Sequence, residues 1–451
     1  MSAVSSALPQ FQLQYPISGT DGFVVGLDHL ARAADGRGLD ALSQIDVAGQ
    51  PDEARLRWLA AELPRRMPLL HATLRKEGLF AVPYWECSGG PVDIPIEFHR
   101  LRGVAGPEPS ELGSLSELRG LRMQGRKRTS LGPPHIRLDV VRTGTETWSI
   151  LMNWSHLLLD GTGVELLFKH MNELWLDPGA VSPVQPVATE KRPWWKLFQE
   201  SEACGRHLMK LGAEPFVSAS KGSLVSGRRC CFWETFSPEE TAKIKLMLGR
   251  IGGDMMRTFF YAALAARCHQ AVFHSRGHQG LSYAVPMPVQ QRPKDANGKT
   301  AVFQNHMSMF FFVLKEGDLA DLATASKALM RQHMEHLKLK RHLSFNAMQL
   351  LMRRMPGKTM LDMVRLGQRG EVASFYHAYT GSFGEGMTTF CGGEIINAIH
   401  MPTVNAPPGS GLFVSECRDQ LTVTVSHLDT CLSEAETDLM RERWRSDLLG
   451  E

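Results

Sequence analysis

A strand pair that leads directly into a helix constrains the fold of this chain more than any other sequence feature. In HIRLDVVRTGTETWSILMNWSH, apolar residues recur at every second position on both sides of Thr143–Thr145, which predicts an antiparallel hairpin. After it, apolar residues from Val164 to Trp175 recur at helical spacing, and Thr162 with Glu165 fits a capping box. We therefore expect a helix from Thr162, with His156–Gly161 as the turn between strand and helix.

This turn holds side chains that are capable of chemistry. A histidine such as His156 can accept a proton from an alcohol or amine at neutral pH, and such general-base help is worth roughly 10² to 10⁴ in rate. Asp160 is expected beside the free N–H groups and positive end of the helix, which favours a carboxylate there on structural grounds alone. The pattern fits equally well a partly buried histidine with backbone partners. The turn is thus a candidate site in which His156 carries the chemistry.

The length of 451 residues predicts two domains or two fused lobes, because single cores stop growing at roughly 250 to 300 residues. Between Leu176 and Gly227 the periodic pattern loosens and prolines accumulate, which favours a crossover. We predict an N-terminal lobe at residues 1–180, a crossover linker at 181–228 and a C-terminal lobe at 229–451.

The second lobe has clear signals of its own. Strand-like CFWETF precedes a capping box at Ser237 and Glu240, and that helix is expected to end near Gly252. A hairpin turning at Arg418–Gln420 and a final helix capped by Ser433 are also predicted. Strands and helices therefore mix in both lobes, which indicates the α/β class.

Composition excludes several functional classes. A net charge of +3 gives no field that favours nucleic acid, and no run approaches the roughly 18 apolar residues of a membrane span. The amino terminus lacks the features of a secretory signal, so we expect a cytoplasmic protein. We also expect a monomer. Eight cysteines without C-x-x-C or zinc-site spacing predict reduced thiols and no metal site.

A basic, methionine-rich stretch from Lys327 to Gly370 contains ten lysines or arginines against Glu335 and Asp362. It fits a solvated helical face with methionines in the core. It also fits a docking surface for an acidic partner such as a phosphate or a carrier protein.

SHLLLDGTG, followed by its amphipathic helix, resembles the (H)HxxxDG motif of the CoA-dependent acyltransferase superfamily. This superfamily includes chloramphenicol acetyltransferase, nonribosomal peptide condensation domains, wax ester synthases and plant BAHD acyltransferases. LPRRMPLLHATL, and VPMPVQQRPKDANGK with QNHMSMFFF, resemble other family segments in the same order. The resemblance implies two chloramphenicol-acetyltransferase-like α/β lobes arranged as a V, with a tunnel between them and the motif histidine at its middle.

The resemblance also implies roles for individual residues. His156 would be the general base, while Asp160 and Gly161 support the site and Arg292 pairs with Asp160. The alternative for Arg292 is a surface loop position before Pro293. Four residues are expected to line the tunnel: Ser155, Asn305, Ser308 and Ser382. For Asn305 and Ser308, ordinary strand packing is the alternative.

Two departures limit the choice of subfamily. Ser155 stands where condensation domains and wax ester synthases usually have a first histidine, so the chain resembles the single-histidine members. The plant-type DFGWG motif is missing, and TGSFGEG at Thr380–Gly386 lacks its aspartate. A divergent bacterial or fungal acyltransferase fits these residues better.

The sequence has no G-x-S-x-G elbow and no phosphate-binding G-x-x-x-x-G-K, which agrees with direct attack on a thioester. We expect an acyltransferase without a bound cofactor that moves an acyl group from acyl-CoA to a hydroxyl or amine of a small-molecule acceptor. One alternative is a free-standing condensation enzyme that uses carrier-protein thioesters in natural-product biosynthesis. Another is a catalytically silent family member that recruits partners.

Overall fold

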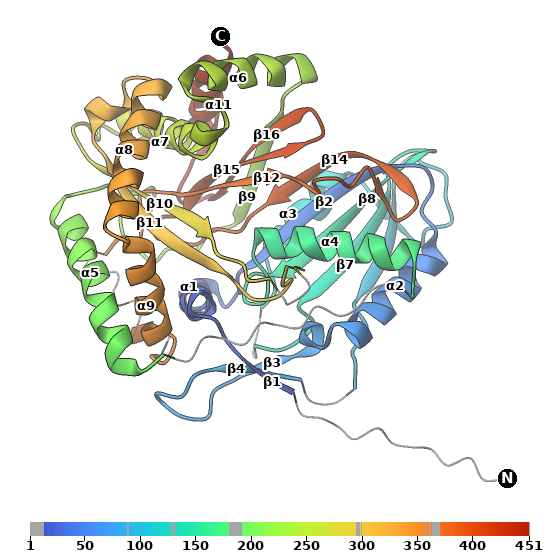
Figure 1. Ribbon diagram of the computed structural model, residues 1–451. Helices are drawn as coiled ribbons and strands as arrows, with labels where there is room; N and C mark the ends of the chain where they lie inside the picture. The colour runs from blue at the N-terminus through green and yellow to red at the C-terminus, as the bar shows by residue number, and fades with distance from the viewer. Residues whose placement is uncertain are drawn as a thin grey trace.

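The computed structural model describes residues 13–87, 90–127, 131–179, 192–294, 298, 300–356, 358–359, 362 and 370–450 (Figure 1). The helices are α1 Gly19–Asp35, α2 Glu53–Arg66, α3 Leu115–Met123, α4 Gly161–Leu176, α5 Trp194–Ala213, α6 Pro238–Ile251, α7 Arg257–Ser275, α8 Leu322–Lys338, α9 Arg341–Met352 and α11 Glu434–Leu449. Three short 3₁₀ helices are η1 Pro68–His71, η2 Gly253–Met256 and η3 Glu316–Leu319.

The strands are β1 Leu13–Pro16, β2 Asp40–Ala48, β3 Thr73–Arg75, β4 Tyr84–Cys87, β5 Ile96–Leu101, β6 Ser110–Leu112, β7 Ile136–Arg142, β8 Thr147–Ser155, β9 Arg229–Thr235, β10 Tyr283–Gln290, β11 Met307–Leu314, β12 Tyr376–Ser382, β13 Thr389–Phe390, β14 Gly393–Met401, β15 Ser410–Cys417 and β16 Gln420–Leu428. They form sheets in the orders β13-β14-β2-β8-β7-β5-β6, β12-β15-β16-β9, β1-β4-β3 and β10-β11. This mixture of helices and sheets confirms the predicted α/β class.

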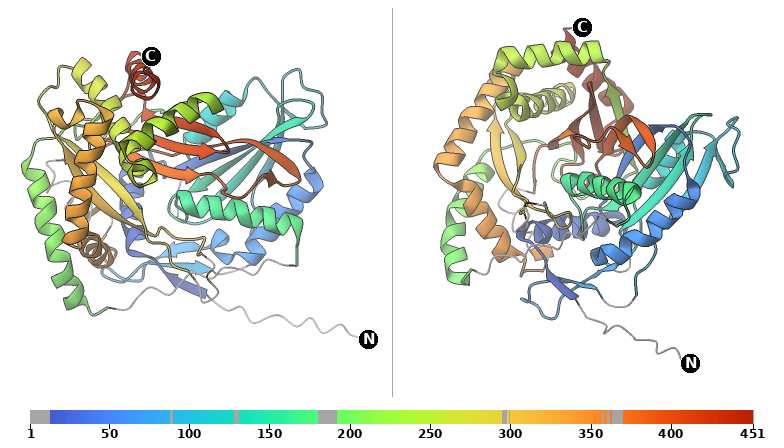
Figure 2. Two further views of the ribbon diagram at one scale, coloured as in Figure 1. Left: turned by 45° about the horizontal axis from the view of Figure 1, so that its top comes forward. Right: turned by 45° about the vertical axis from the view of Figure 1, so that its right-hand side comes forward.

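The seven-stranded sheet contains the predicted hairpin, in which β7 and β8 pair from Ile136↔Trp154 to Arg142↔Trp148. Alternate residues of a strand face opposite sides of a sheet, so this sheet has two apolar faces. One face packs against α2 and α4 and contributes Ile150 to the main core. The other packs against α3 and contributes Leu151. Figure 2 shows α4 and the sheet from two further directions.

A second core lies in the other half of the molecule. The four-stranded sheet packs against α7 and α11, and the β10–β11 pair packs against α8. Helix α5 packs against α9. The capping boxes predicted at Ser237 and Ser433 are present at α6 and α11, and the predicted hairpin β15–β16 forms with Cys417 opposite Gln420.

Strand pairing crosses between the two halves. Strand β14 follows the four-stranded sheet's β12 in sequence, yet it pairs with β2 in the seven-stranded sheet, from Glu394↔Ala48 to Met401↔Leu42. The predicted division at 181–228 remains a prediction, because residues 181–191 lie outside the described part of the chain. Within 192–228 the chain forms α5, a helix that we did not expect from the loosened pattern.

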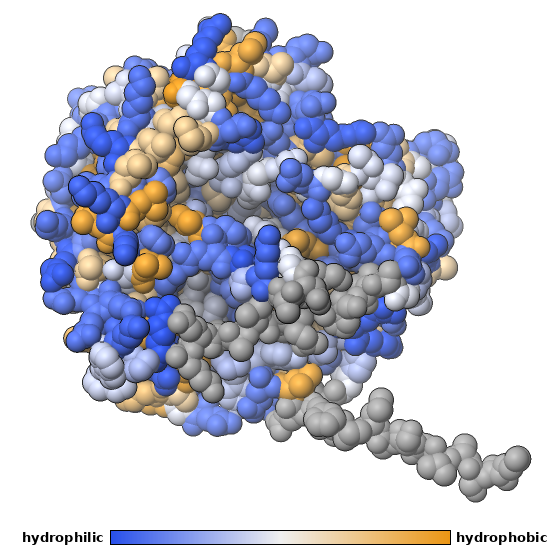
Figure 3. Space-filling model, in the orientation of Figure 1, coloured by the Kyte–Doolittle hydropathy of each residue, from blue (hydrophilic) through white to orange (hydrophobic). Residues whose placement is uncertain are grey.

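Figure 3 shows hydrophilic residues over most of one face, with apolar residues in scattered groups. None of the described helices is long and apolar enough to span a membrane.

Candidate functional site

His156 follows the last residue of β8, where the chain leaves the sheet. Its backbone N–H donates to the carbonyl of Leu39 at 2.9 Å, which holds the turn against the start of β2. Its ring lies 5.5 Å from the Trp154 ring, centroid to centroid. The end of the strand therefore fixes both the backbone and one side of the imidazole.

The imidazole also contacts Asn305, which lies two residues before β11 begins at Met307. Nδ1 of His156 lies 3.1 Å from Oδ1 of Asn305. The Asn305 amide nitrogen donates to Oδ1 of Asp21 at 2.9 Å and to the carbonyl of His156 at 3.0 Å. Because the amide nitrogen faces these acceptors, Oδ1 must accept from Nδ1–H, and the free electron pair is left on Nε2.

Asp21 holds Asn305 in that orientation. It is fully buried in the first turn of α1, where Ser18 and Asp21 form a capping box. Its carboxylate accepts from the Asn305 backbone N–H at 2.7 Å and from the Ser18 N–H at 2.8 Å. Burial raises the pKa of Asp21, and these hydrogen bonds oppose the rise.

Asp160 serves the architecture of the turn. It forms a buried ion pair with Arg292, and both side chains are 2% exposed. Its carboxylate also accepts from the backbone N–H of Gly163 at 2.8 Å and of His306 at 3.2 Å. Through these contacts the carboxylate joins the start of α4 to the segments that carry Arg292 and His306.

The guanidinium of Arg292 makes further hydrogen bonds beside its ion pair with Asp160. It donates to the carbonyls of Ala301 at 2.7 Å, Val302 at 2.9 Å and Gln304 at 3.1 Å. Arg292 is therefore buried against the turn. It does not occupy the surface loop position before Pro293 that was the alternative interpretation.

The start of α4 differs from the prediction. The helix begins at Gly161 and its N-cap is Asp160, so the capping box expected at Thr162 and Glu165 is wrong. Glu165 instead lies 3.1 Å from Nε2 of His400 on β14, and the Thr162 hydroxyl accepts from Gln290 at 2.8 Å. The carboxylate of Asp160, two residues earlier, outcompetes the threonine because it is charged and already fixed by Arg292.

His156 lines a cavity of about 290 Å³ between the two halves. Helix α1, the β10–β11 pair and β12 supply much of its wall, and most of the surface is apolar. The residues that line it include Phe23, Leu27, Trp154, Gly161, Pro286, Met307, Met309, Tyr376, Tyr379, Thr380, His400 and Phe413. Such a lining suits an apolar or amphipathic substrate next to one proton acceptor.

The four residues expected to line the tunnel are absent from the described wall of this cavity. Asn305 lies behind His156, Ser155 is buried, and Ser308 donates to the carbonyl of His342 at 2.9 Å. Ser382 is exposed at the end of β12. Alternation along the chain turns Ser155 and Ser308 away from the cavity, because their neighbours Trp154, His156, Met307 and Met309 line it.

Tyr379 is a wall residue that the sequence analysis did not identify. Its hydroxyl donates to Glu416 at 3.0 Å and accepts from Arg257 at 3.1 Å. Burial, followed by the charge of Glu416, raises the pKa of Tyr379 to about 12, so the phenol stays neutral. No motif marks it, because its partners come from distant strands and helices.

No protein-family model and no curated protein matches this chain. Solved structures do. The first condensation domain of the calcium-dependent antibiotic synthetase, in complex with a substrate analogue, has a TM-score of 0.69 and 15% identity over 97% of this chain and 96% of that one. Trichothecene 15-O-acetyltransferase from Fusarium sporotrichioides has a TM-score of 0.64 and 12% identity, over 97% and 95%. The EpoB cyclization-docking bidomain from Sorangium cellulosum has 0.63 and 14%, over 97% and 83%.

The chain has the fold of condensation domains and this acetyltransferase. At 12 to 15% identity the likeness concerns the fold alone, and it confirms the expected mixed α/β fold shared with condensation domains and an acetyltransferase. In this condensation-domain fold, the cavity beside His156 lies where the two halves meet.

Proposed function

We propose that this protein transfers an acyl group from a thioester to a hydroxyl or amine, with His156 as general base. One observation carries the proposal: Asn305 ties Nδ1 of His156, while the cavity-lining ring has no hydrogen bond at Nε2 from any described residue. A histidine held in one tautomer beside an apolar cavity is equipped to accept a proton.

The reaction balances without a covalent enzyme intermediate. Nε2 takes the proton from the acceptor hydroxyl or amine. At the same time, the oxygen or nitrogen of the acceptor bonds to the thioester carbonyl carbon. The carbon–sulfur bond then breaks as the carbonyl reforms, and the leaving thiolate takes the proton back from His156. Confinement of both substrates in one cavity supplies a large part of the acceleration.

The first choice of donor is acyl-CoA, with a small molecule as acceptor. A carrier-protein thioester is the second candidate, because structures of the same fold include condensation domains of two synthetases. The basic stretch expected to suit an acidic carrier forms α8 and α9 in its described part.

A thiol-release screen against acyl-CoAs and acyl carrier proteins tests the proposal, with a coloured disulfide reagent as readout. We expect release that depends on an acceptor and falls at least ~100-fold in His156→Ala. Ser308→Ala, which removes a buried hydroxyl outside the cavity, is the matched control and should retain activity. Near-normal release in His156→Ala contradicts the proposal. Binding of a donor without any thiol release favours the catalytically silent alternative.

A further inference from the structure

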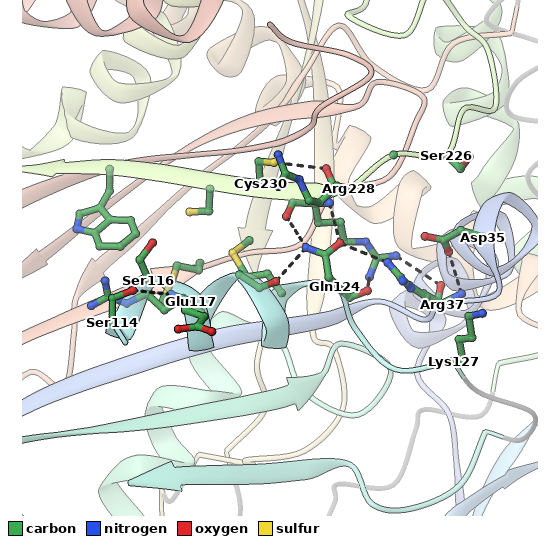
Figure 4. Close-up of a pocket in the computed structure, with 18 residues that line it drawn as sticks. Asp35, Arg37, Ser114, Ser116, Glu117, Gln124, Lys127, Ser226, Arg228 and Cys230 are labelled. Carbon is green, nitrogen blue, oxygen red and sulfur yellow. Dashed lines mark hydrogen bonds between the residues drawn. The ribbon is translucent and has the colours of Figure 1, made fainter. Parts of the chain in front are cut away.

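A second and larger cavity, of about 1000 Å³, lies on the other face of the seven-stranded sheet (Figure 4). On β14, His400 lines the cavity of His156, while the next residue, Met401, lines this one. On β8, Trp154 lines the first cavity, while Asn153 donates to the carbonyl of Arg122 on α3. Because adjacent strand residues face opposite sides, the sheet separates the two cavities.

The wall of this second cavity is strongly basic. Five basic residues line it, namely Arg37, Arg119, Lys127, Arg228 and Arg229, against Asp35 and Glu117. Arg228 pairs with Asp429 at 3.5 Å. The other four basic side chains have no carboxylate within 4.0 Å among the described residues, although ion pairs are common elsewhere in the protein.

Neutral groups hold three of these cations in place, namely Arg37, Arg119 and Arg229. Arg229 is 4% exposed and donates to the carbonyls of Gly38 at 2.8 Å and Gln124 at 3.2 Å. Arg37 donates to the Gln124 side chain at 3.3 Å. The Arg119 guanidinium lies 4.6 Å from the Trp233 ring centroid and donates to Gln44 at 2.7 Å. The positive charges are positioned but not neutralised.

Uncompensated charges in a partly buried cavity are costly. Burial lowers the pKa of both Arg119 and Arg229, although carboxylates at longer range oppose this. An anion between these groups would relieve both the desolvation and the mutual repulsion. Guanidinium groups suit phosphate oxygens because their planar N–H donors match them in pairs.

We propose that this cavity binds a phosphorylated small molecule, with its phosphate among Arg37, Lys127 and Arg229. The apolar part of this ligand would lie against Met123, Trp233 and Met401. Two sources share this chemistry: a free phosphorylated metabolite and the nucleotide end of a CoA donor. The intervening sheet favours the free metabolite. Since α3 and β9 belong to different halves, the ligand would join them.

Calorimetric titration of the full chain with inorganic pyrophosphate at low ionic strength tests the proposal, because screening by salt is then small. We expect binding that weakens at least ~10-fold in the double variant Arg37→Gln/Lys127→Gln, since two cationic contacts to the phosphate oxygens are lost. Both residues are at least partly exposed, so the variant should fold. Lys210→Gln, on exposed α5 surface, and His156→Ala are controls that should bind as the parent does.

Cys230 provides an independent readout, since it lines the cavity and is partly exposed, whereas six of the eight cysteines are buried. We expect pyrophosphate to slow maleimide labelling of Cys230 in the parent but not in the double variant. Absence of binding, or equal binding by the parent and the double variant, overturns the proposal. Titration with pyrophosphate in saturating CoA shows which phosphate the cavity binds. If pyrophosphate and CoA bind together, the ligand is a free metabolite. If they exclude one another, the ligand is the nucleotide end of CoA.

Discussion

Oδ1 of Asn305 lies 3.1 Å from Nδ1 of His156, although the two residues are 149 positions apart in sequence. This hydrogen bond joins the end of β8 to the start of β11 and decides which ring nitrogen can accept a proton. Asp21, from a third segment, fixes the amide that makes it.

Loss of the Asn305 amide should impair catalysis more than binding. In Asn305→Ala the imidazole can rotate and change tautomer, so we expect kcat to fall roughly 10- to 100-fold, with KM little changed. Steady-state kinetics with the best thioester of the screen measures this. Ser308→Ala, two residues into β11, should leave kcat intact. A change confined to KM would contradict the assigned role.

Removal of the charge of Asp160 should destabilise the fold. Asp160→Asn leaves Arg292 buried without its carboxylate, and we expect the free energy of unfolding to drop by about 3 to 5 kcal/mol. Urea unfolding measures the difference. Asp438→Asn breaks the exposed pair with Arg441 and should cost at most about 1 kcal/mol. Equal losses in the two variants would show that the Asp160–Arg292 ion pair stabilises the fold no more than an exposed ion pair does.

Gly163 should tolerate a methyl group less well than Gly161. A Cβ at Gly163 would lie 2.6 Å from the carbonyl of Val302, whereas one at Gly161 would lie 3.8 Å from its nearest neighbour, on Thr380. We expect Gly163→Ala to lower the free energy of unfolding by about 1 to 3 kcal/mol. Gly161→Ala should fold normally and change KM, because Gly161 lines the cavity.

Gly249→Ala on α6 is the matched control, since nothing lies within 4 Å of its added Cβ. It should stabilise the protein by up to about 1 kcal/mol, because alanine favours helix. Thermal and urea unfolding of the three variants compares them. Normal stability of Gly163→Ala would contradict the close approach at Val302.

Stability should fall as the pH drops below neutral. Burial lowers the pKa of His269 and of His377 to about 4 each, from an ordinary value of 6.5. Between these values the unfolded chain binds more protons than the folded one, so stability rises with pH across this window. At pH 5 each histidine should cost about 2 kcal/mol relative to pH 7.

Urea unfolding between pH 4 and 7 measures this slope. In His269→Gln, the slope should decrease by about one proton, since one titrating group is removed. An unchanged slope would show that His269 is not the group responsible.

The local elements could largely be predicted from the sequence, because their determinants are close in the chain. Alternation around Thr143–Thr145 specified the β7–β8 hairpin, and Ser237 and Ser433 marked two helix starts. The residue pattern around the turn made His156 a candidate, and the resemblance of SHLLLDGTG to a family motif singled it out. The α4 cap was misjudged because Asp160 and Thr162 are both acceptable caps, and only Arg292 decides between them.

The site itself was decided by tertiary structure. Alternation within a strand indicates that neighbouring residues face apart, but not which face meets the cavity, so the sequence did not show that Ser155 and Ser308 lie outside the described cavity wall. The orientation of the His156 ring depends on Asn305 and Asp21, and the basic cavity depends on α3 meeting β9. Sequence determined the turn that presents one histidine, because its signals act over a few residues. Only long-range packing determined the proton-accepting nitrogen and the surface that it faces.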